Sequence, residues 1–194
     1  MIFTAITGSI GCGKTTIANI LRSLGFVVYD ADKWVKYLYY DKKFLDIIRL
    51  YFPETFQNGC FIKSKLRTLV FNDLDKLNLL ERLIYPYLIR KLKRIIRYRQ
   101  NKGLVFMDIA LLYEKDWNRY FDYVILADVE KNIQKSRVMK RDNISAEEFD
   151  KINGIQMSME QKRERADFIV DTGVHINKLK KHVIDIVEFL ERYE

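Results

Sequence analysis

The chain has 194 residues, a formal net charge of +8, 48% hydrophobic and 31% charged residues, and two cysteines. This size and composition are typical of one soluble globular domain. They argue against a disulfide framework and against a membrane span, because no apolar run approaches the roughly 20 residues that a membrane helix needs. We therefore expect a cytoplasmic protein without membrane contact, whose positive charge suits a nucleic acid or a small molecule with several phosphates.

The first predicted elements are a strand, a glycine-rich loop and a helix. Residues 2–7 form an apolar, β-rich run, and the spacing of Ile17, Ile20 and Leu21 predicts a helix over residues 16–22. Between them, residues 8–15 read Gly-Ser-Ile-Gly-Cys-Gly-Lys-Thr and match G-x-x-x-x-G-K-[ST] at each fixed position. Correct flanks on both sides favour a phosphate-binding loop over a glycine-rich turn that carries a lysine by chance.

The chemistry of such a loop explains its residue types. Backbone amides can wrap a triphosphate only where no Cβ intervenes, which the three glycines of the loop permit. Lys14 would place its ammonium between the β- and γ-phosphates, and Thr15 would offer its hydroxyl to Mg²⁺.

A second strand is predicted over residues 26–29, followed by Asp30-Ala31-Asp32 and a helical run over residues 33–39. Ligands bind at the carboxyl ends of strands in an open α/β sheet. An aspartate at this place could accept the proton of an attacking hydroxyl or help to hold a metal ion, and it could also cap the helix. The position alone leaves these roles open for Asp30 and for Asp32.

Residues 41–99 are predicted to be mostly helical, with a turn at Asn58-Gly59 and a short helix over residues 63–71 that carries Arg67. Arg67 is available to a ligand, although a solvated surface position is the ordinary interpretation. The long apolar pattern over residues 74–99 is interrupted at Tyr85-Pro86, where we expect a kink or break. The basic run over residues 90–102 is typical of a solvated helix face, and we prefer this interpretation to nucleic-acid binding.

A strong strand over residues 104–108 ends in Asp108, which is either a carboxylate close to a magnesium ion or a capping residue. A further strand is predicted over residues 122–127 and a helix over residues 129–139. Arg137 and Arg141 share one helix face because they are four residues apart. Asp142-Asn143 then breaks the helix, and a new one begins with a capping box at residues 145–148.

This basic helix end, followed by a break and a newly capped helix, suggests a mobile lid. The planar guanidinium groups of its arginines suit phosphate oxygens, although they could instead pair with surface glutamates. A last strand over residues 168–170 and a terminal amphipathic helix complete an α/β pattern.

Taken together, the motifs resemble the dephospho-coenzyme A kinase family over nearly the whole chain. The phosphate loop is shared by many kinases, whereas the Asp-Ala-Asp and Arg-x-Arg-Ala-Asp segments in this order are far more selective. The matching segments are residues 7–15, 30–32, 58–73, 108–114, 137–142 and 156–173.

The resemblance implies an α/β P-loop fold with a five-stranded parallel sheet in the order 2-3-1-4-5. The core would comprise residues 1–30, 103–135 and 166–194, with a helical acceptor-binding region over residues 31–102 and a lid over residues 136–165. The implied reaction is phosphoryl transfer from ATP with Mg²⁺ to the ribose 3′-hydroxyl of dephospho-CoA. A monomer or weak homo-oligomer without nucleic acid is expected.

The resemblance also implies roles for single residues. Asp32 would be the base that takes the proton of the acceptor hydroxyl, and the transferring group would be stabilised by Lys14, Arg137 and Arg141. Mg²⁺ would be held by Thr15 and Asp108. The acceptor would contact Asp32, Arg67, Tyr85 and Leu111. The nucleotide would contact Gly8, Ser9, Ile10, Gly11, Cys12, Gly13, Lys14, Thr15, Thr16, Arg163 and Thr172.

Three positions depart from the family pattern. The family usually has His-Pro where this chain has Tyr85-Pro86, proline in place of Ala110, and serine in place of Cys12. Tyr85 does not ionise near neutral pH as histidine does, and Cys12 adds an oxidation site to the loop. The alternative functions are another small-acceptor kinase, for a nucleotide or a sugar, and an ATP-dependent nucleic-acid-binding protein.

Overall fold

The computed structural model describes residues 2–97 and 103–193, and the chain forms two compact units. The core unit holds residues 1–30 and 100–194, and the helical unit holds residues 31–99. The last part of the predicted basic run, including Arg99 and Lys102, lies outside the described residues. None of the described helices is long and apolar enough to cross a membrane.

The core unit is built on a sheet of five parallel strands in the order β2-β5-β1-β6-β7. Counted along the chain within this sheet, the order is the predicted 2-3-1-4-5, which is confirmed. All six residues of the central strand β1 are buried, as expected where helices or loops cover both faces of a parallel sheet. The strands are β1 (Ile2–Thr7), β2 (Val27–Asp30), β5 (Leu104–Asp108), β6 (Tyr123–Asp128) and β7 (Phe168–Asp171).

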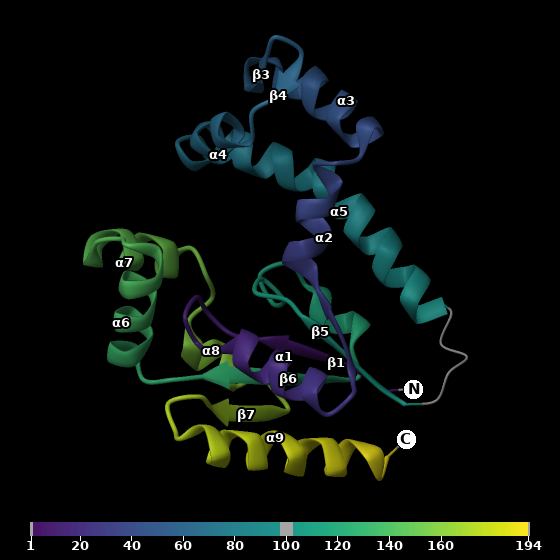
Figure 1. Ribbon diagram of the computed structural model, residues 1–194, viewed down its shortest axis with the longest axis vertical. Helices are drawn as coiled ribbons and strands as arrows, with labels where there is room; N and C mark the ends of the chain where they lie inside the picture. Colours follow the sequence, from purple (N-terminus) through teal and green to yellow (C-terminus); the bar gives the residue numbers. More distant parts are fainter. Residues whose placement is uncertain (1, 98–102, 194) are drawn as a thin grey trace. The chain divides into compact units, whose positions relative to one another are not determined.

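One face of the sheet is covered by α1 (Lys14–Ser23) and α9 (Ile176–Glu191), which pack against each other (Figure 1). Their buried side chains lie on one face of each helix and join Ile6 and Phe106 of the sheet in one apolar cluster. On the other face, alternate residues such as Phe3 point away from this cluster, and Phe3 packs on Phe121 with ring centroids 4.6 Å apart.

Beyond β6 the chain forms α6 (Lys131–Asp142), α7 (Ala146–Gly154) and α8 (Met159–Arg163); a 3₁₀ turn (Trp117–Tyr120) precedes β6. Helix α6 extends three residues past its predicted end and stops at Asn143, whose left-handed backbone (φ 53°) cannot continue a helix. The predicted capping box is confirmed, because Ser145 Oγ accepts from the Glu148 amide and the Glu148 carboxylate accepts from the Ser145 amide.

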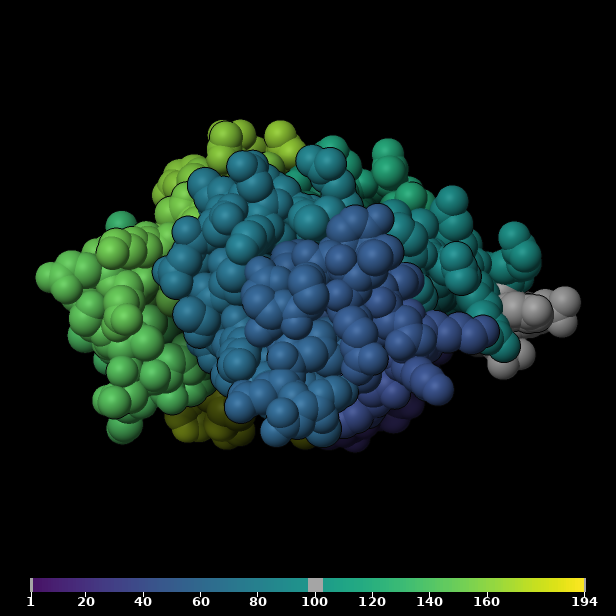
Figure 2. Space-filling model, turned by 90° about the horizontal axis from the view of Figure 1, so that it is seen from above, coloured from purple at the N-terminus to yellow at the C-terminus, as the bar shows by residue number. Residues whose placement is uncertain are grey.

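The helical unit contains four helices and a short hairpin among its described residues. The sequence predicted only a turn at Asn58-Gly59, whereas the two residues on each side pair as strands; positive φ angles of 49° and 79° at the turn suit a tight hairpin. Figure 2 shows the blue residues of this part as one continuous surface. The elements are α2 (Ala31–Leu38), α3 (Lys42–Tyr51), a 3₁₀ turn (Pro53–Thr55), β3 (Phe56–Gln57), β4 (Cys60–Phe61), α4 (Lys63–Phe71) and α5 (Leu74–Arg97).

Of the kink or break predicted at Pro86, the break is wrong, because α5 runs through this proline as one helix. Pro86 and Arg82, whose carbonyl loses its helical partner at this proline, are both exposed, so water can satisfy the carbonyl. Burial every fourth residue continues across the proline and keeps the helix packed, at Leu80, Ile84, Leu88 and Leu92.

Candidate active site

The turn between β1 and α1 forms the phosphate loop predicted from the sequence. Helix α1 begins at Lys14, and Gly13 precedes it with a left-handed backbone (φ 87°). Within the described ranges, no side chain caps this helix end. Its first amides and the positive end of its dipole are therefore available to an anion such as a phosphate group.

Three glycines of the loop have positive φ angles and leave no room for a Cβ; the closest contact, 2.4 Å, would be between a Cβ on Gly11 and Val138. A Cβ on Gly8 (φ 146°) would lie 2.5 Å from the carbonyl oxygen of Ala127, and a Cβ on Gly13 would lie 2.7 Å from Thr172 Oγ1. All three distances are too short for real contacts. The loop is therefore pressed against the ends of neighbouring strands, and its backbone can approach a ligand closely.

Lys14 folds back over the loop that it follows. Its Nζ donates to the carbonyl oxygens of Gly8 at 2.7 Å and Ser9 at 3.3 Å. Thr15 and Thr16 follow in the first turn of α1, where Thr15 is exposed. The ammonium therefore lies at the loop, and the Thr15 hydroxyl is accessible at the adjoining helix end.

Two carboxylates lie at the carboxyl edge of the sheet beside this loop. Asp108 ends β5 and is the register partner of Ile6 in β1, and Asp30 ends β2 as the register partner of Asp108. In the part of the chain that the structure describes, no cluster of three or more metal-ligating side chains occurs. Mg²⁺ on a nucleotide commonly uses one or two protein groups together with phosphates and water, so Thr15 and Asp108 are a suitable donor set.

Thr172, a predicted nucleotide contact, joins two other predicted site residues, Cys12 and Arg137, in one cluster. Its Oγ1 donates to the Cys12 carbonyl oxygen at 2.8 Å and accepts from Arg137 Nη1 at 3.1 Å. Arg137 Nη2 also donates to the Thr172 carbonyl oxygen at 2.8 Å. Helix α6, the end of β7 and the phosphate loop are thus connected through one buried hydroxyl.

Arg163 makes a two-pronged ion pair with Asp128, the last residue of β6. Its Nε and Nη2 lie 2.7 Å and 3.0 Å from the two carboxylate oxygens. Hydrogen bonding to Asp128 raises the pKa of Arg163 above its ordinary value. Sequence reasoning missed Asp128, although it ends an apolar strand as Asp30 and Asp108 do, and this common signal could have identified it.

Arg141 is engaged differently from Arg137. Its Nε and Nη2 donate to the two carboxylate oxygens of the adjacent Asp142 at 2.8 Å and 2.7 Å, and this bonding raises the pKa of Arg141. The Arg141 side chain is 61% exposed. The two arginines therefore share a helix but have different partners.

Several residues that the sequence did not single out hold the phosphate loop in place. The amide of Ile10 donates to Gln156 Oε1 at 2.9 Å, and its carbonyl oxygen accepts from Gln134 Nε2 at 2.8 Å. Lys162, with a side chain that is fully buried, pairs with Glu114 at 2.9 Å. A lysine in the charged run over residues 160–167 gives no sequence signal of burial, because only the fold surrounds it.

The helical unit has a groove of about 450 Å³ that holds two of the predicted acceptor residues, Asp32 and Arg67. Lys63 Nζ lies over the Tyr39 ring and Arg67 Cζ over the Phe71 ring, each 5.4 Å from the ring centroid. Burial raises the pKa of Tyr39 to about 12, so this ring is neutral. The other lining residues are Val35, Lys36, Leu66, Val70 and Leu80.

The two remaining predicted acceptor residues are not among those that line this groove. Tyr85 lies on α5 of the same unit, and Leu111 lies in the turn after β5 in the core unit. The structure therefore brings together Asp32 and Arg67 and adds Lys36, Lys63 and Tyr39, which sequence reasoning missed.

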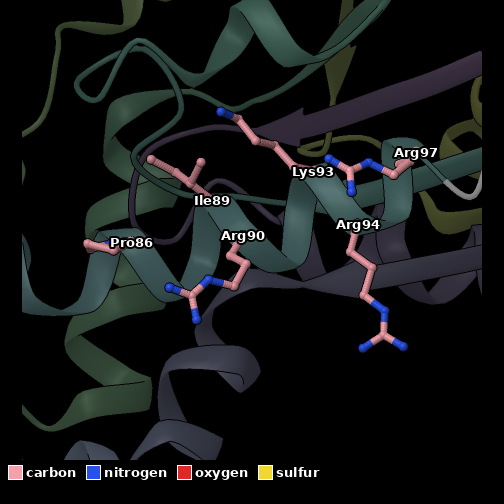
Figure 3. A pocket seen from close by; sticks show the side chains of 6 residues that line it. All are labelled: Pro86, Ile89, Arg90, Lys93, Arg94 and Arg97. Atoms are coloured by element: carbon pink, nitrogen blue, oxygen red, sulfur yellow. The ribbon is translucent and has the colours of Figure 1, made fainter.

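A second pocket, of about 420 Å³, lies along the basic part of α5 (Figure 3). Figure 3 shows Arg90 and Arg94 extending to one side of the helix and Lys93 to the other. These cations diverge rather than converge on one point, in agreement with a solvated helix face. The pocket is lined by Pro86, Ile89, Arg90, Lys93, Arg94 and Arg97.

Known proteins resemble the chain over almost its whole length. A family model described as dephospho-CoA kinase matches residues 2–178. The dephospho-CoA kinase of Bartonella henselae is 39% identical over 192 residues, which cover 98% of each protein, and that of Rickettsia bellii is 34% identical over 193 residues, again 98% of each.

Solved structures agree with these relatives. A crystal structure from Thermus thermophilus has a TM-score of 0.85 at 32% identity, covering 96% of this chain and 95% of that one. The dephospho-CoA kinase from Campylobacter jejuni has a TM-score of 0.65 at 25% identity, with the same coverage. A shikimate kinase from Bacteroides thetaiotaomicron, at 13% identity and a TM-score of 0.57 over 98% of each chain, shares the fold alone. The predicted α/β P-loop kinase fold is confirmed.

Proposed function

The chain belongs to the dephospho-CoA kinase family, and from this premise we propose that it transfers the γ-phosphoryl group of ATP to the ribose 3′-hydroxyl of dephospho-CoA. The observation that carries the proposal is the combination, in one chain, of a phosphate loop in the core unit and a cationic groove with a carboxylate in the helical unit. The family match over residues 2–178 covers both units.

The chemistry of the groove suits dephospho-CoA as the acceptor. Lys36, Lys63 and Arg67 provide three cations for the pyrophosphate of this molecule, and arginine can grip phosphate oxygens with two parallel hydrogen bonds. The rings of Tyr39 and Phe71 and the apolar floor offer a surface for the uncharged parts of the ligand. The volume of about 450 Å³ is in the ordinary range of small-molecule sites.

Asp32 is proposed to accept the proton of the attacking 3′-hydroxyl. It lies in the first turn of α2, two residues after the end of β2, and it lines the groove. A carboxylate that removes this proton as the new P–O bond forms contributes about 10²–10⁴ in rate. Tyr85 and Leu111 remain acceptor contacts inferred only from the family resemblance.

Phosphoryl transfer needs positioning and positive charge more than covalent chemistry from the protein. We assign Lys14 and Arg137 to the phosphates, because Lys14 bonds to the loop itself and Arg137 reaches the loop through Thr172. Arg141 would join them after it leaves Asp142. Thr15 and Asp108 would hold Mg²⁺, which when bound neutralises charge on the β- and γ-phosphates.

The test is phosphate transfer from Mg-ATP to dephospho-CoA, followed by the mass of the product, with Asp32→Asn measured in parallel. We expect the wild-type protein to form coenzyme A. We expect Asp32→Asn to keep its ATP affinity and lose about 10²–10⁴ of turnover, because the amide cannot accept the proton.

Asp46→Asn is the matched control, since Asp46 is an exposed carboxylate on α3 outside the groove. It should turn over like wild type. Hydrolysis of ATP without formation of coenzyme A by the wild-type protein would reject the proposed acceptor, and full turnover of Asp32→Asn would reject Asp32 as the base.

A further inference from the structure

An ion pair between Lys162 and Glu114 is buried in the core unit next to the phosphate loop. The Lys162 side chain is 0% exposed, and its Nζ lies 2.9 Å from Glu114 Oε1. The same carboxylate oxygen accepts from the amide of Met157 at 2.9 Å. The pair therefore connects the turn after β5, the segment before α8, and α8 itself.

Stability alone is a weak reason for such a pair. Removing two charges from water costs free energy that their attraction often fails to recover, so apolar residues of similar volume commonly serve as well. The second carboxylate oxygen of Glu114, Oε2, is buried and has no hydrogen-bond partner among the described residues. The ion pair therefore leaves one of its own buried polar atoms unsatisfied in the described part of the chain. For this reason we look for its role in the other contacts of Lys162.

Lys162 also contacts Ser9, the second residue of the phosphate loop. Lys162 Nζ donates to Ser9 Oγ at 3.5 Å, the long end of the hydrogen-bond range, and Ser9 Oγ donates to Met159 Sδ at 3.2 Å. Ser9 is 1% exposed. Both partners of its hydroxyl belong to α8, so this helix holds the loop at Ser9 while Gln134 and Gln156 hold it at Ile10.

We propose that Lys162 and Glu114 are positioning residues for phosphoryl transfer, which hold the phosphate loop through Ser9 in the conformation that receives the nucleotide. The inference depends on the proposed function, because it takes ATP as the ligand of this loop. Glu114 fixes the ammonium of Lys162, and Lys162 fixes Ser9. Neither residue contacts the reacting atoms; they act by keeping the loop amides arranged before the nucleotide binds.

The test separates positioning from stability with three variants. Lys162→Met leaves a buried carboxylate without its cation and should lower the melting temperature strongly. Lys162→Met combined with Glu114→Gln removes both charges while the new side-chain amide oxygen still accepts from Met157, so most of the melting temperature should return. If the pair positions the loop, this double variant should still bind ATP more weakly and show a kcat roughly 10- to 100-fold lower, with an unchanged KM for dephospho-CoA.

Ser9→Ala is the third variant and does not depend on the charges. It removes the hydroxyl that Lys162 and Met159 hold, in a position where alanine is easily accommodated. We expect a kcat loss of similar size with little change in melting temperature. Wild-type kinetics of Ser9→Ala would overturn the proposal even if the charge variants fail to fold.

The matched control is Lys76→Met combined with Glu54→Gln, which makes the same substitutions in an exposed pair of the helical unit (3.3 Å, with side chains 38% and 49% exposed). It should behave like wild type. A Lys162→Met, Glu114→Gln variant with restored melting temperature and full kcat would reduce the pair to a structural role. Wild-type protein that makes no coenzyme A would instead reject the proposed function, so the two failures are distinguishable.

Discussion

At the residue scale, burial decides how Cys12 behaves. This cysteine stands in the phosphate loop where the family usually has serine, and from the sequence it adds an oxidation site. The structure buries it completely, and burial raises the pKa of its thiol. Because the thiolate is the reactive form, a protonated and enclosed thiol is a poor nucleophile, so this departure does not by itself create a reactive site.

We therefore predict that a thiol-alkylating reagent at mildly alkaline pH modifies the exposed Cys60 first and Cys12 only as fast as the loop opens. Peptide mass spectrometry over time would show this order, and in denaturant both cysteines should react alike. Equal rates in the folded protein would contradict the burial of Cys12.

At the element scale, α7 has a complete capping box at its start and one buried residue along its length. Phe149 is the buried residue of this helix, so we expect the capping box at Ser145 and Glu148 to matter for its stability. A short helix with one buried residue should open more readily than α9, which has five buried residues.

Ser145→Ala should destabilise α7 by about 1 kcal/mol, because the Glu148 amide loses its acceptor. Hydrogen exchange of the α7 amides is the measurement, with faster exchange confined to this helix. Ser145→Asp is the control, since its carboxylate can still accept this bond and should preserve the protection. Unchanged exchange in Ser145→Ala would show that the cap does not limit opening.

At the scale of the whole molecule, each unit contains a tyrosine whose pKa is raised to about 12, mainly because its side chain is removed from water: the half-buried Tyr39 in the helical unit and the buried Tyr113 in the core unit. The fold favours the neutral phenol over the phenolate. Its contribution to stability is complete below the ordinary pKa of about 10 and is lost as the pH rises toward about 12.

The free energy of unfolding should therefore fall between about pH 10 and about pH 12, as measured by denaturant titration at each pH. Tyr39→Phe and Tyr113→Phe should each flatten part of this fall. Tyr113→Phe should cost little at neutral pH, because the Tyr113 hydroxyl is buried without a hydrogen-bond partner among the described residues. An unchanged alkaline slope in both variants would contradict the assignment.

The strands, the phosphate loop and the start of α7 could be predicted from the residues alone, whereas the order of the sheet was expected from the family resemblance. The first three depend on local patterns: the apolar runs of the strands, residues 8–15 between a strand and a helix, and the capping box at Ser145. Each pattern acts within a few residues, so it can be read along the chain. The resemblance to a kinase family rested on the same short segments.

Which distant residues share a partner depends on how the chain packs. Thr172 meets Cys12 and Arg137, and Lys162 meets Glu114 and Ser9, across separations of 35 to 160 residues that no local pattern encodes. Tertiary packing also accompanies the continuation of α5 through Pro86, since Leu80, Ile84, Leu88 and Leu92 are buried on both sides of the proline. Burial and pairing depend on the packed chain. For this reason the sequence did not show that Lys162, which lies in a charged run, is fully buried.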